Sequence, residues 1–327
     1  MTAAHRDGNP VRAGLRQPLA LGYAAALSAV LITAAYPSLT RISVTSTLTP
    51  GDLLLLRLGV SGLLFAPWLW RRRHSVTRAE WRAAFPLSML QGWGMAGCVV
   101  FGLRFAPASH AAALGPGAIA AWIALVGFLA FGIRVAPRRL AGMVIIVVGV
   151  LLMLAASGGG HSIDDAIVGD ALFLAASAQG ACYFVFVQRR RLDPVLGAAL
   201  VCVASAAVII PWHVLFATSS LATAPLAEIA WQLAFQGLVV GGVAFLALNF
   251  AALTIGSQAL GVMSALVPVF GAAFATLIAG DAMSSLEGLA IVVISLGVLA
   301  AALPVGKPQL AQVLRHGVAP LGHSTVT

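Results

Sequence analysis

The sequence predicts an all-α integral membrane protein whose ten transmembrane helices form two inverted five-helix repeats. Hydrophobic residues make up 60% of the 327 residues and charged residues only 9%, whereas a soluble domain carries about 25% charged residues. Apolar runs reach the ~20 residues that a membrane-spanning helix needs, and none alternates like a barrel strand. Several sequence features also recur in the same order in both halves of the chain.

The recurrence indicates a duplicated half. The spacing of glycines over residues 132–149 returns over residues 280–297. Pro50 and Pro194 each precede a Pro-Trp pair by the same number of residues. Features that return in one order argue for an internal repeat of about 150 residues.

The spans are apolar runs bounded by short turns rich in Pro, Gly and Arg. The first run is too long for a signal-peptide core and no small-residue cleavage pattern follows it, so we expect it to remain in the protein. The spans are expected over residues 19–40, 50–70, 84–103, 108–131, 139–157, 167–188, 194–216, 231–254, 258–279 and 286–303. Residues 1–18 form a basic flexible tail, 19–157 the first repeat, 158–166 a linker, 167–304 the second repeat and 305–327 a second tail.

Basic residues predict the orientation. With the N-terminus inside, 16 of the 19 Lys and Arg residues fall on the cytoplasmic side, only Arg41 and Arg104 fall outside, and Arg57 lies within a span. Cytoplasmic loops are the ones that carry an excess of Lys and Arg. We therefore expect a bacterial inner-membrane protein with both termini on the cytoplasmic side. Five spans per half make the second half enter the membrane inverted, which is typical of transporters with a site near the midplane.

Other function classes lack their signals. The net charge of +9 is explained by arginines between spans, so we expect no nucleic-acid partner. Cys98, Cys182 and Cys202 lie inside spans without metal-ligand spacing and are interpreted as packing residues. Catalytic and nucleotide-binding motifs are not found, so we expect no enzyme, no cofactor and no metal. A scaffold would not require inverted duplication.

The motifs resemble those of the EamA-type branch of the drug/metabolite transporter superfamily, over nearly the whole chain. The resemblance rests on Pro50 with Arg57, Gly102-Leu-Arg-Phe-Ala-Pro-Ala, Ala252-Leu, Pro268, Gly280-Asp281 and two Gly-Val span ends. It implies a ten-helix exporter of small metabolites. Relatives export aromatic amino acids, cysteine-pathway metabolites, threonine or homoserine, nucleosides or xenobiotics. The chain departs from the family's Gly-Glu after the fourth span, where it has Gly132-Ile133, and Pro116 sits about one turn earlier than Pro268.

The resemblance implies a central cavity lined by the first, third, fourth, sixth, eighth and ninth spans. Polar, aromatic and sulfur-containing side chains within these spans are the candidate substrate-binding residues, because lipid offers polar groups no partners. They are Ser28, Gln91, Trp93, Met95, Trp122, Gln179, Tyr183 and Ser264. Such a pocket suits a small amphipathic ligand. The alternative is that the Trp side chains pack between helices while the Gln side chains bond neighbouring backbone.

Four residues are candidate gates, and a fifth, Arg57, carries a charge within a span. Tyr36 and Tyr183 occupy equivalent places in the two repeats and are interpreted as outer and inner gates or as interfacial anchors. Pro116 and Pro268 interrupt spans and join the gating set. Arg57 lies about 10 Å into the second span by helical rise, where it either holds a substrate carboxylate or has a structural role.

The acidic residues bear on the driving force. All ten Asp and Glu residues fall in loops or at span ends, so facilitated transport is favoured over proton antiport. His110 and His213 are expected to meet interfacial water. We therefore predict a carrier that exports amino acids, with aromatic ones favoured, by alternating access. The alternative is multidrug or nucleoside efflux by proton antiport. The fifth and tenth spans are expected to contact lipid or the second copy of a homodimer.

Overall fold

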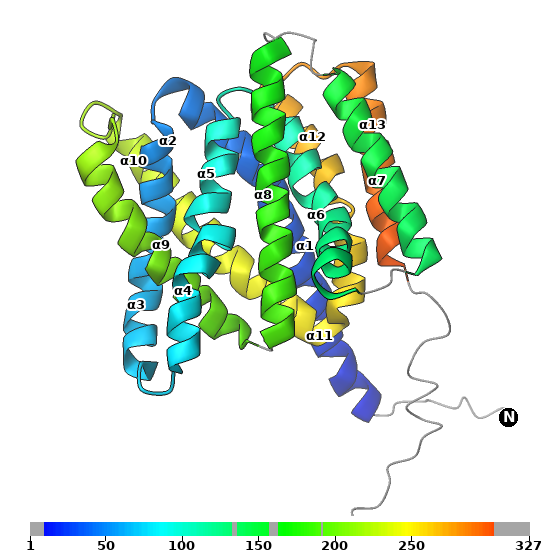
Figure 1. Ribbon diagram of the computed structural model, residues 1–327, viewed down its shortest axis with the longest axis horizontal. Helices are drawn as coiled ribbons and strands as arrows, with labels where there is room; N and C mark the ends of the chain where they lie inside the picture. Colours follow the sequence, from blue (N-terminus) through cyan, green and yellow to red (C-terminus); the bar gives the residue numbers. More distant parts are fainter. Residues whose placement is uncertain (1–9, 133–135, 157–162, 191, 304–327) are drawn as a thin grey trace, which may run out of the picture.

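The computed structural model describes residues 10–132, 136–156, 163–190 and 192–303, which form a helical bundle (Figure 1). The first repeat contains α1 (Pro10–Ser46), α2 (Pro50–Leu54), the π-helical segment η1 (Leu55–Gly59), α3 (Val60–Arg72), α4 (Arg78–Gln91), α5 (Trp93–Gly102), α6 (Ala108–Phe131) and α7 (Pro137–Ala156). The second contains α8 (Ile163–Arg190), α9 (Pro194–Phe216), α10 (Leu226–Gln232), the π-helical segment η2 (Leu233–Ala244), α11 (Phe245–Ser264), α12 (Val267–Leu277) and α13 (Ser285–Ala302).

The predicted fold class is confirmed. Within the described residues, 10 helices are long and apolar enough to cross a membrane, and each coincides with a predicted span. Most span ends agree within a few residues, but the eighth span covers Leu226–Leu248 rather than 231–254. The first helix also begins at Pro10, so the second half of the predicted flexible tail is helical. Proline favours the first turn of a helix because it lacks the N–H that would be unsatisfied there.

Local signals explain the ends that the apolar runs did not predict. Thr77 and Glu80 form a capping box that starts α4 at Arg78, six residues before the predicted span, because the hydroxyl and the carboxylate bond the free N–H groups of the first turn. At the other end of α1, the hydroxyls of Thr45 and Ser46 donate to carbonyls of the preceding turn. The helix therefore continues through a polar stretch to Ser46.

Among the described residues, the third and ninth spans are each divided into two separate helices. The third span breaks at Gly92 (φ −100°, ψ −113°), which separates α4 from α5. The ninth span breaks between Ser264 and Val267, so that Pro268 stands in the first turn of α12. Pro116, in contrast, lies inside the continuous helix α6. Broken helices of this kind line the substrate sites of many transporters.

The duplication is visible in the backbone. Gly132 ends α6 with φ of 63°, and Gly280 follows α12 with φ of 71°. The two glycines are equivalent in the predicted repeats, and both adopt the left-handed conformation that favours glycine at helix ends. The same turn therefore closes the fourth span of each half.

Glycines also bring α7 and α13, the fifth spans of the two halves, into close contact. They lie side by side at the edge of the bundle (Figure 1). A Cβ at Gly149 would lie 2.9 Å from the Ile294 nitrogen, and one at Gly297 would lie 2.7 Å from the Ile146 nitrogen. The two aliphatic spans thus pack on each other, while large side chains such as Leu151 and Leu296 remain exposed on their other faces.

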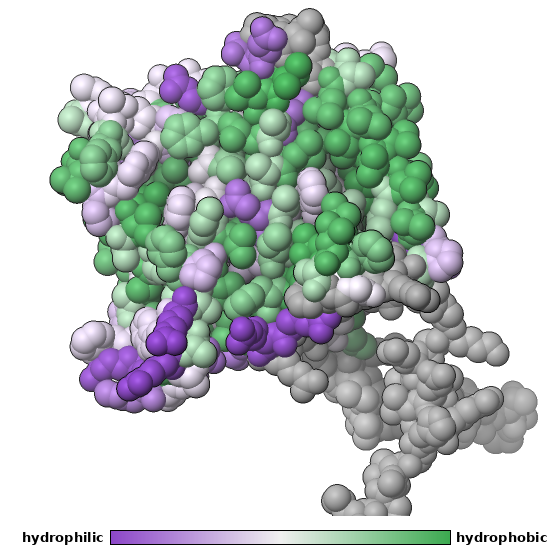
Figure 2. Space-filling model, in the orientation of Figure 1, coloured by the Kyte–Doolittle hydropathy of each residue, from purple (hydrophilic) through white to green (hydrophobic). Residues whose placement is uncertain are grey.

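The two ends of the bundle differ in charge. Exposed arginines gather around the turn between α3 and α4, at Arg71, Arg72, Arg73, Arg78 and Arg82, which we call the basic end (Figure 2). We call the opposite end, where α2, α6, α8, α10 and α13 begin, the distal end. The sides between the two ends are largely hydrophobic in Figure 2. Residues 1–9, most of the predicted linker 158–166 and the tail 305–327 lie outside the described residues.

Candidate functional site

Arg57 lies in η1, where wider turns interrupt the second span. Its guanidinium carbon lies 4.6 Å from the centroid of the Tyr36 ring of α1. Within the described part of the chain the guanidinium has no ion pair or hydrogen bond, while the buried hydroxyl of Tyr36 is also without a partner. A permanently charged side chain at this depth, held by a ring face alone, is suited to bind an anion.

A second group of polar atoms surrounds the break at Gly92. Gln91 Oε1 and Trp93 Nε1 flank the break and are buried without a partner. A Cβ at Gly92 would lie 1.9 Å from Ser205 Oγ of α9, which shows that this hydroxyl touches the break. Ser205 Oγ is also without a partner. Unpaired buried polar atoms each cost about 1–3 kcal/mol, so a ligand that bonds them would be held at this place.

The sixth span reaches the same break. A Cβ at Gly94 would lie 2.7 Å from Gln179 Oε1 of α8, which is buried without a partner. The Gln179 amide nitrogen donates to Cys98 Sγ at 3.3 Å. Met95 packs against Gly180, with its sulfur 3.5 Å from a Cβ built there. The predicted residues Gln91, Trp93, Met95 and Gln179 therefore cluster around one helix break, and Gln179 bonds a cysteine rather than the backbone.

The other candidate residues lie elsewhere. Tyr183 is buried against Leu87 and Val201. Ser28 is exposed and donates to the Ala24 carbonyl, while Ser264 donates to the Leu260 carbonyl. Trp122 is partly buried in α6. Among the described residues, no hydrogen bond joins these four residues to the break at Gly92, and their roles in binding or gating stay predictions.

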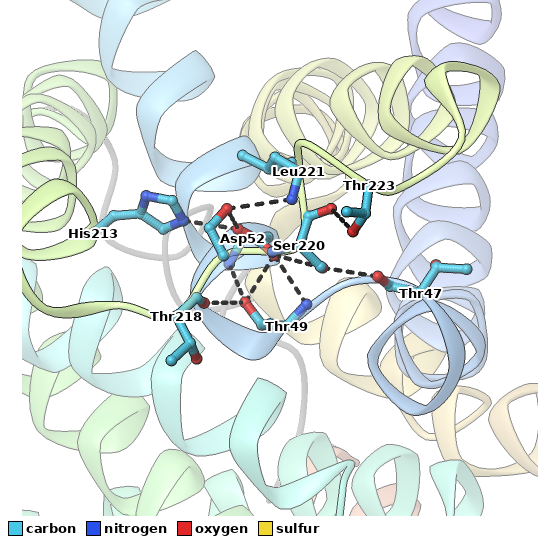
Figure 3. Close-up of polar contacts among 9 residues, drawn as sticks. Thr47, Thr49, Asp52, His213, Thr218, Ser220, Leu221 and Thr223 are labelled. Carbon is cyan, nitrogen blue, oxygen red and sulfur yellow. Dashed lines mark hydrogen bonds and ion pairs between the residues drawn. The ribbon is translucent and has the colours of Figure 1, made fainter.

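The distal end carries polar contacts between the two repeats. Asp52, in the first turn of α2, is fully buried. Its carboxylate accepts hydrogen bonds from His213 Nε2 at 2.8 Å, Ser219 Oγ at 2.7 Å and the Ser220 N–H at 3.0 Å, all from the second repeat (Figure 3). Thr49 adds bonds from its own hydroxyl and N–H. This carboxylate ties α2 to the end of α9 and the loop that follows it.

A second cluster joins three helices. His110, in the first turn of α6, directs Nδ1 at Asp170 Oδ1 of α8 at 2.8 Å and Nε2 at Glu287 Oε1 of α13 at 3.3 Å. His110 and Asp170 are fully buried, and Glu287 is 6% exposed. The expectation that His110 and His213 meet interfacial water is therefore wrong, because both rings pack against carboxylates.

A third contact fixes the turn before α6. Arg41 of α1 pairs with Asp281 at 3.1 Å and also donates to the Leu103 and Ala106 carbonyls. Asp281 in turn accepts from the Ala108 N–H at 2.8 Å. Sequence reasoning missed these contacts. The available signal was that Arg41 is an isolated basic residue on the outer side, and that Asp281 stands at a span end.

The bundle of two inverted repeats, with polar groups at a helix break inside it, defines a multi-pass membrane transporter of small molecules. The EamA-like transporter family model matches residues 20–155 and again 167–303. The chain belongs to the EamA-like transporter family, whose members are transporters rather than enzymes.

Other comparisons bear on the fold alone. A crystal structure superposes with a TM-score of 0.60 at 21% sequence identity, over 91% of this chain and 99% of the other. The search of curated proteins found no match. The fold is therefore shared with a solved structure, and the substrate must be inferred from the residues of this chain.

Proposed function

We propose that the protein exports small amphipathic metabolites that carry a carboxylate, with aromatic amino acids as the favoured substrates, by alternating access of its two repeats. The observation that carries this proposal is Arg57, a partly buried guanidinium that has no acidic partner among the described residues. Charge-assisted bonds from arginine to a carboxylate are among the strongest hydrogen bonds. They gain further strength away from bulk water.

The surroundings favour an aromatic side chain on the substrate. Leu55 of η1 and Trp93 at the helix break pack on the same hydrophobic core. The polar atoms of Gln91, Gln179 and Ser205 beside Trp93 can bond an amino group or an indole N–H. A ligand with one carboxylate, one amino group and one ring would use all of these groups.

The side of the membrane that each end of the bundle faces is proposed from the basic residues. The arginines around the α3–α4 turn are exposed at the basic end, and α8 ends there with Arg189 and Arg190. An excess of basic residues is typical of cytoplasmic loops. This supports a bacterial inner-membrane protein whose basic end and termini face the cytoplasm, and whose distal end opens outward.

Uptake of radiolabelled tryptophan into proteoliposomes of the full-length protein tests the proposal. Three unlabelled competitors separate the carboxylate, the amino group and the aromatic ring: phenylalanine keeps all three, tryptamine lacks the carboxylate, and indole-3-propionate lacks the amino group. We expect saturable uptake that phenylalanine inhibits strongly, indole-3-propionate moderately and tryptamine weakly. Inhibition by tryptamine equal to that by phenylalanine would contradict recognition of the carboxylate and favour efflux of cationic drugs.

A further inference from the structure

The cluster of His110, Asp170 and Glu287 at the distal end has an unusual hydrogen-bonding requirement. Each ring nitrogen of His110 faces a carboxylate oxygen, Nδ1 toward Asp170 and Nε2 toward Glu287. A neutral imidazole carries one N–H, so it can donate to only one of two ionised carboxylates. The other ring nitrogen would direct its lone pair at the lone pairs of an oxygen.

Both contacts become hydrogen bonds when the cluster holds one more proton. That proton sits either on the ring, which then donates from both nitrogens, or on one carboxyl group, which then donates to the ring. The cluster needs this proton whichever of these atoms carries it. With His110 and Asp170 fully buried, water cannot replace the missing bond, and an unmade bond there would be costly.

The three residues join the two repeats. His110 belongs to α6 in the first repeat, whereas Asp170 and Glu287 belong to α8 and α13 in the second. His110 and Glu287 stand in the first turns of helices that begin at the distal end. Separation of the repeats at this end would break both contacts and expose the cluster to the solution on that side.

The other described charged groups near this end of α6 lie on the elements that surround it. Around α6, Arg41 of α1 and Asp281 of the loop before α13 are paired with each other. Arg104, which follows α5, and Asp164 and Asp165, at the start of α8, are exposed to the solution. The described residues of α7 and α12 add no charged side chain at this end. Among the described residues, the charged groups that face the His110 ring are thus Asp170 and Glu287.

We propose that His110, Asp170 and Glu287 form a proton-binding site that takes up one proton when the distal end closes and releases it to the same side when that end opens. The site makes closure depend on the pH at the distal face without carrying protons across the membrane. Transport thus stays facilitative and becomes pH-sensitive. The inference rests on the proposed movement of the repeats and is independent of the substrate.

His213 provides the matched control at the same end. It also joins the repeats through a carboxylate, but only its Nε2 faces one, at 2.8 Å from Asp52 Oδ1. A neutral ring with its N–H on Nε2 makes that bond, so closure there requires no extra proton. Replacing His213 removes a contact of similar burial and leaves the proposed proton site intact.

The distance across the distal end measures closure without any substrate. Spin labels at Arg104→Cys and Met283→Cys, both exposed and on opposite repeats, report it by pulsed electron paramagnetic resonance, after Cys98, Cys182 and Cys202 are replaced by Ala. Because the closed state binds one proton more, its ratio to the open state should rise as pH falls, by up to about tenfold per pH unit. The range between about pH 5 and 8 suits a histidine-centred site.

Three further variants in the labelled background sharpen the test. Glu287→Gln supplies an amide N–H to the ring without a proton from solution, so the closed distance should persist at every pH. His110→Gln should abolish the pH dependence, whereas His213→Gln should retain it. A single distance at all pH values in the unsubstituted labelled protein would overturn the inference. So would a full pH response in both Glu287→Gln and His110→Gln.

Proton flux tests release to the same side. With a pH-sensitive dye inside proteoliposomes, substrate influx should proceed without a matching change of internal pH. Proton movement in fixed proportion to substrate would contradict same-side release and indicate antiport. Absence of tryptophan transport combined with the expected pH response of the labels would contradict only the proposed substrate, so failures of the two proposals are distinguishable.

Discussion

The guanidinium of Arg57 stacks on the ring of Tyr36, with the guanidinium carbon 4.6 Å from the ring centroid. This contact joins the second span to the first, and it leaves the donors of the guanidinium without a partner among the described residues. The ring therefore holds the charge in place without neutralising it. In our account that combination is what allows the charge to bind a substrate carboxylate.

Substitutions at Tyr36 separate the ring from its hydroxyl. Tyr36→Leu removes the ring face and should raise the KM for tryptophan about fivefold, the ratio that corresponds to a cation–π contact of ~1 kcal/mol. Tyr36→Phe keeps the face and should change KM by less than about twofold. Initial uptake rates over a range of tryptophan concentrations give both values. Equal effects of the two variants would show that the stack does not position Arg57.

Asp52 should matter more for stability than for transport chemistry. Both carboxylate oxygens of Asp52 accept hydrogen bonds, and Asp52→Asn replaces one of them by an amide nitrogen that cannot accept. At least one buried donor then loses its acceptor, at a cost of about 1–3 kcal/mol in the free energy of unfolding. Thermal unfolding in detergent, followed by tryptophan fluorescence, should show a lower midpoint. The control is Asp193→Asn, because Asp193 is an exposed helix cap and asparagine caps equally well. Equal midpoints for the two variants would contradict the role of Asp52.

Two glycines on α13 form a matched pair for helix packing. A Cβ at Gly297 would lie 2.7 Å from the Ile146 nitrogen and 2.9 Å from the Gly142 oxygen, both backbone atoms, whereas one at Gly288 meets nothing within 4 Å. Gly297→Ala should destabilise the protein by about 1–3 kcal/mol through overpacking. Gly288→Ala should be neutral or stabilising by up to about 1 kcal/mol. Denaturation of the two variants side by side measures this, and equal stability would contradict tight backbone packing of α13 on α7.

Much of the fold could be predicted because each span is an apolar run of sufficient length. The equivalent turns at Gly132 and Gly280 were also predicted, since the repeat was visible in the spacing of glycines. The start of α4 at Arg78 was missed because its first turns are polar and are fixed by a capping box rather than by lipid. The helix break at Gly92 gave no signal beyond a single glycine.

The candidate site was only partly predictable. Arg57 was recognised because a charge inside an apolar run needs a reason, and Gln91, Met95 and Gln179 because polar or sulfur-containing groups lie inside predicted spans. Their partners were not predictable. In a membrane bundle the lipid-facing and the core-facing sides of a helix are both apolar, so periodicity does not show which helices meet. His110 therefore seemed interfacial until α8 and α13 were seen to pack around it.

Uptake by Arg57→Met tests the central claim most directly. The control is Arg73→Met, because Arg73 stacks on Trp70 at 4.4 Å but lies exposed at the basic end. Loss of a charge-assisted bond of about 1.5–3 kcal/mol should lower kcat/KM for tryptophan by roughly tenfold to a hundredfold in Arg57→Met, with Arg73→Met unchanged. A well-folded Arg57→Met protein that carries tryptophan at the unsubstituted rate would contradict the account.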